Sequence, residues 1–135
     1  MRRSLVALAL AGVLAFGCGR ARAQSALSTD NRSQKITTGN TYQLVEAANN
    51  VRRMVQIENN NTNTDDCWVN DDGTVAASNT TSTNVTVHGT TMTAAQASIR
   101  LTPGNAYTRY YPYVPDGPIV VTCTSTGDSM YAGIH

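Results

Sequence analysis

The chain has 135 residues, ten of them basic and nine acidic, which gives a formal net charge of +1 at pH 7. This length suits one domain rather than two. After residue 23 the only adjacent basic pair is Arg52-Arg53, interpreted here as solvated residues at the start of a strand. Nucleic-acid binding, which needs clustered Lys and Arg, is therefore disfavoured.

The N-terminal region, residues 1–23, is predicted to be a cleaved secretory signal. It begins with a basic pair, and its uncharged run at 5–16 is only about 12 residues long, too short to cross a bilayer. Residues 21–23 supply the small side chains of a cleavage site before Gln24. The alternative treats Cys18 as the lipid-modified first residue of a lipoprotein. No other stretch suits a membrane span, so we expect a periplasmic or secreted protein.

The cysteines fit export. There are three in the chain, and loss of the signal removes Cys18 and leaves the pair Cys67 and Cys123. In an oxidising compartment such a pair is predicted to form a disulfide. Two free thiols or a metal pair remain the alternative, although the spacing is far from Cys-x-x-Cys. The same cleavage leaves six basic against nine acidic side chains, so the mature protein is mildly acidic.

The mature chain reads as all-β. A polar segment at 24–35 is predicted to be a flexible leader, and short β-rich runs then alternate with turn residues through 36–135. Strands are expected at 42–45, 53–58, 67–69, 85–87, 98–101, 107–113, 119–123 and 130–134. The Thr-rich residues 74–97 are expected to form a largely exposed excursion. The pattern predicts a small antiparallel β-sandwich, immunoglobulin-like or jelly-roll-like, with about seven or eight strands and one disulfide.

Alternation within the expected strands assigns their inner faces. Val55 and Ile57 fall on one face of their strand, as a half-buried antiparallel strand requires. The same parity places Cys123 and Cys67 on buried faces. We therefore expect their bridge to join the two sheets through the core, with Trp68 facing the other way.

The sequence offers little for catalysis. Its two histidines are His88, in the Thr-rich excursion, and His135, the last residue, and no G-x-S-x-G elbow accompanies them. The carboxylate pairs at 65–66 and 71–72 lie in turn-forming segments, where Asp bonds the nearby backbone, and they lack EF-hand spacing. Phosphate and dinucleotide motifs do not occur. We expect a protein that is not an enzyme and needs no metal or cofactor.

Tyrosines are the most informative feature. Four tyrosines and Arg109 lie within the seven positions 107–113. Clusters of Tyr and Arg are enriched at interfaces and can stack on sugar rings or a protein partner. Because the chain after residue 23 has no Phe, some of these tyrosines can instead fill the core, and both interpretations stay open. The candidate binding surface, for a protein or glycan partner not identified by the sequence, consists of Tyr107, Arg109, Tyr110, Tyr111 and Tyr113, with Trp68 as a possible neighbour.

Several motifs together suggest a relationship. They are Arg52-Arg53 leading into 55–60, Cys67-Trp68-Val69, the run 99–104, and Tyr107-Thr108-Arg109-Tyr110. Over residues 41–134 they resemble small β-sandwich proteins of uncharacterised function from bacteria and their phages. In phage-type relatives the RR-x-x-x-I-x-N strand and the L-x-P-G-x-x-Y turn recur in virion-associated or host-interaction proteins.

The resemblance implies a binding or assembly role. The signal and the Thr-rich excursion set this chain apart from a virion protein assembled in the cytoplasm. The sequence therefore favours an exported, non-enzymatic protein with a structural or binding role in the envelope or outside the cell. The alternatives are a phage- or prophage-derived virion-associated protein, and a small periplasmic inhibitor or carbohydrate-binding module.

Overall fold

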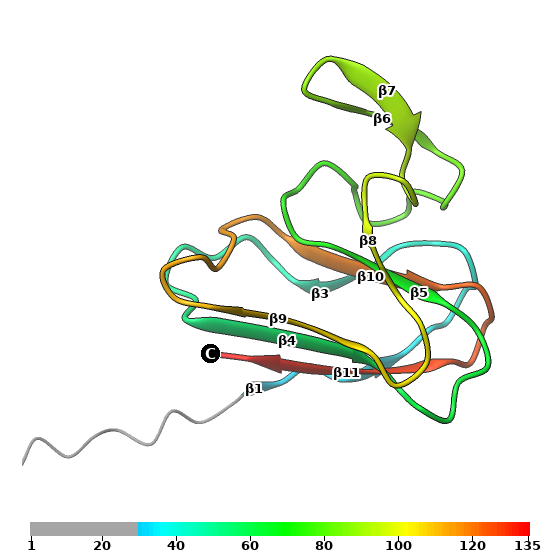
Figure 1. The fold of residues 1–135 in the computed structure, drawn as a ribbon, viewed down its shortest axis with the longest axis horizontal. Helices are drawn as coiled ribbons and strands as arrows, with labels where there is room; N and C mark the ends of the chain where they lie inside the picture. The colour runs from blue at the N-terminus through cyan, green and yellow to red at the C-terminus, as the bar shows by residue number, and fades with distance from the viewer. Residues whose placement is uncertain (1–29) are drawn as a thin grey trace, which may run out of the picture.

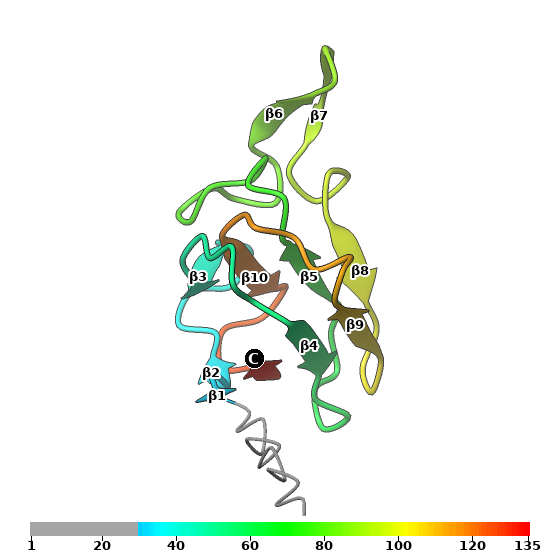
Figure 2. The same cartoon turned by 90° about the vertical axis from the view of Figure 1, so that its left-hand side faces the viewer.

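The computed structural model describes residues 30–135. The predicted signal peptide, Cys18, the cleavage site and the first part of the leader lie outside the described residues. The described chain forms two antiparallel sheets that face each other, together with a separate hairpin (Figures 1 and 2). The predicted all-β sandwich is confirmed. Within residues 30–135 no helix has the length and apolar character needed to cross a membrane.

The two sheets are stacked as layers. The first has the strand order β1-β11-β4-β9, with β2 also paired to β11, and the second has the order β3-β10-β5-β8. Strands β6 and β7 form the separate hairpin. The strands are β1 (Asp30–Asn31), β2 (Gln34–Lys35), β3 (Gln43–Glu46), β4 (Met54–Asn59), β5 (Cys67–Asn70), β6 (Asn84–Val87), β7 (Thr90–Thr93), β8 (Ile99–Leu101), β9 (Ala106–Tyr110), β10 (Ile119–Cys123) and β11 (Ser129–Ile134).

The main core lies between the sheets and follows the predicted alternation. Val55 and Ile57 of β4 are fully buried, whereas Gln56 and Glu58 between and after them are partly exposed. Burying each such aliphatic side chain contributes roughly 1.5–3 kcal/mol. The buried residues of this cluster are Ile36, Val55, Ile57, Cys67, Val69, Leu101, Tyr107, Ile119, Val121, Cys123, Met130, Ala132 and Ile134.

The outer face of the second sheet is covered as well. All five residues of β10 are buried, because Val75, Val85 and Ala94 from the Thr-rich segment pack with Tyr42 and Val120 on that face. The expectation that residues 74–97 would be largely exposed is therefore wrong for the base of this segment. Its apolar side chains are few, but they are spaced so that they reach one surface.

The tip of the same segment does project. Strands β6 and β7 pair from Val87↔Thr90 to Asn84↔Thr93 and leave His88 and Gly89 as a two-residue turn. Both turn residues have positive φ, 48° and 80°, which is the geometry whose twist suits a tight hairpin. The hairpin extends away from the two sheets (Figure 2).

The predicted disulfide between Cys67 and Cys123 is present, but it does not join the two sheets. The cysteines are register partners on the neighbouring strands β5 and β10 of one sheet. The next pair along the two strands, Asp66 and Thr124, is hydrogen-bonded, with Thr124 N donating to Asp66 O at 3.1 Å. Because hydrogen-bonded and non-hydrogen-bonded pairs alternate, the cysteines form a non-hydrogen-bonded pair, where the strands approach most closely. Parity correctly predicts that both point inward but cannot say which strands are neighbours.

Two boundaries also differ from expectation. Part of the predicted leader is paired, since β1 and β2 both lie against β11; a polar sequence can do this because backbone groups make the bonds. The expected strand at 107–113 ends at Tyr110. The following residues, which include Pro112, form a turn with Tyr113 N donating to Tyr110 O at 2.9 Å.

Candidate binding surface

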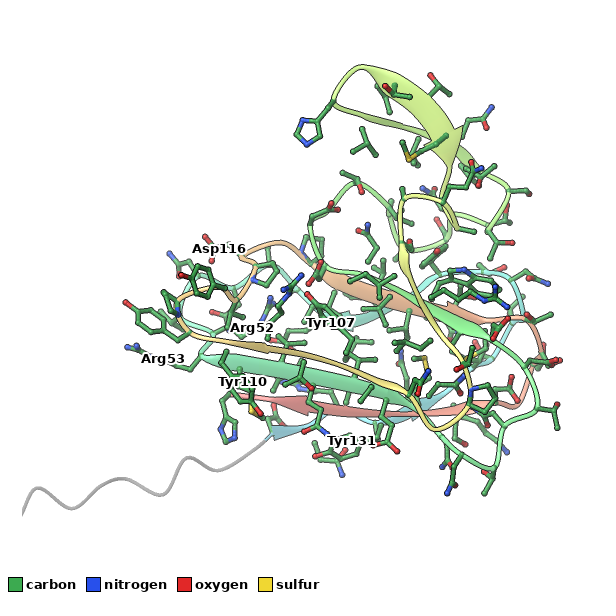
Figure 3. All side chains as sticks on the ribbon, in the orientation of Figure 1. Arg52, Arg53, Tyr107, Tyr110, Asp116 and Tyr131 are labelled. Carbon is green, nitrogen blue, oxygen red and sulfur yellow. A yellow bond between two sulfur atoms is a disulfide. The ribbon has the colours of Figure 1, made fainter. Side chains whose placement is uncertain are left out.

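Two connections meet at one end of the sandwich. Residues 47–53 join β3 to β4, and residues 111–118 join β9 to β10. Tyr111 N donates to Arg53 O, and Asn49 N donates to Asp116 O, both at 2.9 Å. Figure 3 shows Arg53, Asp116 and Tyr110 at this end. Backbone bonds therefore hold the two connections side by side.

This end gathers exposed apolar side chains. The described residues include six exposed large hydrophobic side chains, and four of them lie here: Val51 at 73%, Tyr110 at 63%, Tyr111 at 65% and Tyr113 at 79%. The guanidinium of Arg53 lies over the ring of Tyr111, 4.8 Å from its centroid. We call this surface the tyrosine end; it consists of Val51, Arg53, Arg109, Tyr110, Tyr111 and Tyr113.

The buried side chain of Arg52 supports the tyrosine end. It is only 4% exposed, which contradicts the expectation that both arginines of the pair are solvated. Its guanidinium donates to the carbonyl oxygens of Pro115 at 2.6 Å, Gly117 at 3.2 Å and Ala47 at 3.0 Å. Burial lowers the pKa of Arg52, while nearby carboxylates oppose that shift. One buried side chain thus clamps both connections.

Tyr107 belongs to the core rather than to the exposed surface. It is 8% exposed, and its hydroxyl donates to the carboxylate of Asp71, in the segment after β5. Arg109 Nε in turn donates to the Tyr107 hydroxyl oxygen at 2.8 Å. Burial and the bond to Asp71 raise the pKa of Tyr107 to about 12. This contact links β9 of the first sheet to the second sheet.

Close backbone packing completes the support. Gly117, in the connection that carries the tyrosines, lies under the turn at 71–73, and a Cβ there would stand 2.9 Å from Asp71 O. Real Cβ atoms do not approach backbone so closely without displacement, and glycine is the residue that permits such contact. The tyrosine-bearing connection is therefore held at several points.

Trp68 is not a neighbour of this surface. It packs against the second apolar cluster, on the outer face of the second sheet, because it alternates with the inward-facing Cys67 and Val69. Of the six predicted surface residues, the structure brings Arg109, Tyr110, Tyr111 and Tyr113 together. Sequence reasoning missed Val51, whose only signal is an apolar residue directly after the Asn49-Asn50 turn.

A small hollow lies between the two connections. Its volume is about 200 Å³, below the roughly 300–1,000 Å³ typical of sites for small molecules. It therefore suits one side chain of a larger partner better than a whole cofactor. Its lining residues are Asn50, Val51, Arg52, Arg53, Tyr111, Pro112, Val114 and Asp116.

The predicted turn carboxylates are engaged. Asp66 forms a salt bridge with Arg100, and Asp65 accepts from Ser125. Asp72 accepts from the backbone N of Thr74 at 2.9 Å, which is the turn role expected from sequence. His88 is exposed at the hairpin tip, so it does not act as a general base within a buried catalytic cleft.

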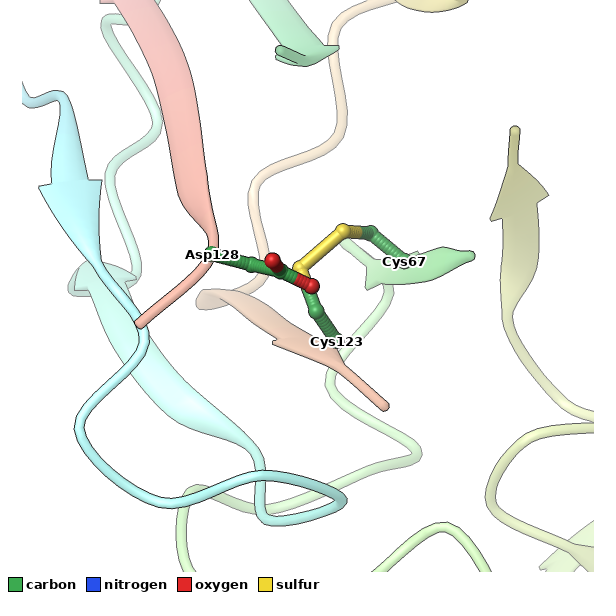
Figure 4. A group of neighbouring side chains, drawn as sticks. All are labelled: Cys67, Cys123 and Asp128. Carbon is green, nitrogen blue, oxygen red and sulfur yellow. A yellow bond between two sulfur atoms is a disulfide. The ribbon is translucent and has the colours of Figure 1, made fainter. Parts of the chain in front are cut away.

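One titratable group lies beside the disulfide. Asp128 is close to Cys67 and Cys123 (Figure 4), and its carboxylate and the two sulfur atoms all lie within 4.8 Å of one another. Its Oδ2 is buried without a hydrogen-bond partner, and burial, with the nearby Asp65, raises its pKa. Because the sulfurs are bonded to each other, they offer no thiolate to a metal ion.

Compared with known proteins, the chain matches no family model, no curated protein and no solved structure. The resemblance to small phage-related β-sandwich proteins therefore stays a hypothesis.

Proposed function

We propose that this chain is an exported β-sandwich protein that acts by binding a macromolecular partner through the tyrosine end. The observation that carries the proposal is that four of the six exposed large hydrophobic side chains of residues 30–135 gather at one end, beside Arg53 and Arg109. Tyr and Arg dominate the binding energy of protein interfaces, since each combines large contact area with hydrogen-bonding capacity.

The support beneath these tyrosines favours binding as well. Arg52 donates to the carbonyl oxygens of three loop residues, and Tyr107 bonds to Asp71 in the segment that follows β5 of the second sheet. Loops that are already fixed lose less conformational entropy on association, so more of the contact energy appears as affinity.

Export is supported by the disulfide. Such bonds persist outside the reducing cytosol, and Cys67 and Cys123 are bridged. Together with the signal-like residues 1–23, this favours a periplasmic or secreted protein. Intact mass measurement of protein from the native envelope and medium tests it: a chain that begins at Gln24 and gains two hydrogens on reduction supports export, and a chain that retains Met1 with free thiols contradicts it.

A second candidate function uses the projecting hairpin. A small inhibitor presents a rigid protruding segment to its target, and the β6–β7 hairpin with its tight His88-Gly89 turn has that form. A carbohydrate-binding role has less support, because Trp68 packs within the second cluster instead of joining the tyrosines on an exposed platform. A phage-derived assembly role would use the tyrosine end for contacts between virion proteins.

The binding proposal is tested by matched surface variants in the native host. In the first, Tyr110, Tyr111 and Tyr113 are replaced by Ser; in the control, Leu44 and Tyr131, which are exposed elsewhere, are replaced by Ser. We expect the wild-type protein and the control to elute from size exclusion in a complex, and the tyrosine variant to elute as a monomer. A complex that survives in the tyrosine variant, or a monomeric wild type, overturns the proposal.

A further inference from the structure

In the described part of the chain, strand β9 is an edge strand of the first sheet, paired only with β4. The bonds from Tyr111 N to Arg53 O and from Asn59 N to Asn105 O show that odd-numbered residues turn their backbone groups toward β4. The alternating pattern of antiparallel pairs then directs the backbone N–H and C=O of Ala106 and Thr108 away from β4. Within residues 30–135 these groups have no hydrogen-bond partner.

This edge is the longest one available. Strand β9 has five residues, compared with four in β3, three in β8 and two each in β1 and β2, the other edge strands of the described sandwich. It contains neither Pro nor Lys, which natural proteins use to block edges against pairing. It also leads directly into the tyrosine end (Figures 1 and 3).

The charge beside the Tyr110 end of the edge is positive. The described residues contain six basic and nine acidic side chains, yet Arg109 lies within β9 and Arg53 lies over Tyr111, just beyond its end. The guanidinium of Arg109 bonds the phenol oxygen of Tyr107, whose hydroxyl donates to Asp71. The carboxylate on the neighbouring strand is Glu58, the register partner of Ala106 at the far end of the edge. An otherwise acidic molecule thus presents its free edge beside two cationic groups.

We propose that the free edge of β9 binds an extended, acidic segment of a partner polypeptide as an added antiparallel or parallel strand. The partner's backbone pairs with Ala106 and Thr108, its carboxylates face Arg109 and Arg53, and one of its side chains enters the hollow of about 200 Å³. This is strand addition, in which main-chain bonds give affinity and neighbouring pockets give specificity. The inference deepens the proposed function and rests on it.

Two other occupants fit less well. A glycan has no alternating N–H and C=O groups with which to extend the sheet. A second copy paired about Thr108 would bring Arg109 of each copy into the same two-stranded ribbon, where like charges repel. The cationic edge therefore favours an acidic strand from a different protein.

The test uses two capped eight-residue peptides, one alternating Glu with Val and one alternating Lys with Val. Isotope-labelled protein with its disulfide intact is titrated with each, and amide exchange is followed residue by residue. We expect the Glu peptide to slow exchange at the Thr108 and Ala106 amides and to bind at least about tenfold more tightly than the Lys peptide. A Glu peptide N-methylated at every residue, which has no N–H group on either edge, is expected not to bind.

Protein variants separate the backbone from the charge. Thr108→Pro removes a donor that points to the free edge and leaves the bonds to β4, a position where Pro is tolerated; Thr108→Val is its control. We expect Thr108→Pro to lose the peptide and Thr108→Val to keep it. Should Thr108→Pro fail to fold, Arg53→Gln with Arg109→Gln replaces it and is expected to abolish the preference for Glu over Lys.

Several results overturn the inference: equal binding of both peptides, no binding of either, binding that leaves the Thr108 amide unchanged, or Thr108 protection that rises with protein concentration alone, which indicates a second copy. These outcomes are distinct from failure of the proposed function. A native complex that depends on the tyrosines while the edge stays unprotected removes strand addition only.

Discussion

The adjacent arginines Arg52 and Arg53 have opposite environments, and their replacement should have unequal effects. Arg52→Met removes the donors for three carbonyl oxygens, at 2.6, 3.2 and 3.0 Å, inside a site where the side chain is 4% exposed. A net contribution of about 1 kcal/mol per bond, with the cost of leaving buried carbonyls unpaired, predicts a loss of about 3 kcal/mol in unfolding free energy.

Arg53→Met is the matched control. The Arg53 side chain is exposed, and its interaction is with the face of Tyr111 at 4.8 Å. Such an exposed cation–π contact contributes roughly 0.5–1 kcal/mol. The two substitutions are chemically identical and one residue apart, so their difference isolates burial and hydrogen bonding.

Urea unfolding of both variants with the disulfide intact, followed by Trp68 fluorescence, measures the two free energies. We expect Arg52→Met to lower the midpoint strongly and Arg53→Met to lower it slightly. Amide exchange in residues 111–118 should also become faster in Arg52→Met only. Equal destabilisation by the two substitutions, or unchanged exchange in this connection, would refute the role of Arg52 as a clamp.

Three further predictions follow from other buried groups. The folded-state pKa of Tyr107 is raised from 10.0 to about 12, so its contribution to the unfolding free energy is complete below pH 10 and is lost as pH rises toward 12. Urea titrations should show the wild type losing about 2–3 kcal/mol more unfolding free energy than Tyr107→Phe over that range. Equal losses in the two proteins would contradict this. The pKa of Asp128 is raised in the folded protein, so ionisation of its carboxyl group opposes folding. Asp128→Asn should therefore raise the melting temperature at pH 7 and not at pH 3. A lower melting temperature of the variant at pH 7 would show that the carboxylate is stabilising. Replacing Cys67 and Cys123 together by Ala removes a bridge across 56 residues and should cost about 4 kcal/mol in the chain-entropy estimate, measured against the oxidised protein; a loss below about 1 kcal/mol would assign the bridge a minor role.

Alternation made much of the fold predictable. The two-residue period of a strand places Val55 and Ile57 on the same face, which predicts that both are buried. The same period predicts that both cysteines point inward. It could not identify their strands as neighbours, because pairing between residues 56 positions apart in sequence depends on the order of strands in the sheet, on which local periodicity is silent.

The site was predictable only in part, for a related reason. A continuous strand through 107–113 would place Tyr107, Tyr111 and Tyr113 on one face, but β9 ends at Tyr110, and the later tyrosines turn outward. Arg52 and Arg53 carry the same local signal in the sequence. Their burial differs because carbonyl groups of the surrounding loops accept hydrogen bonds from Arg52 and not from Arg53.

Site-specific photo-cross-linking tests the central claim most directly. A photoreactive phenylalanine analogue is placed at Tyr111 in the tyrosine end or, as control, at Tyr131 on the outer face of β11, and the cells are irradiated before the protein is isolated. The account predicts one defined cross-linked protein from position 111 and none from position 131. Cross-linking from position 131 with none from position 111 would place the partner surface elsewhere and contradict the account.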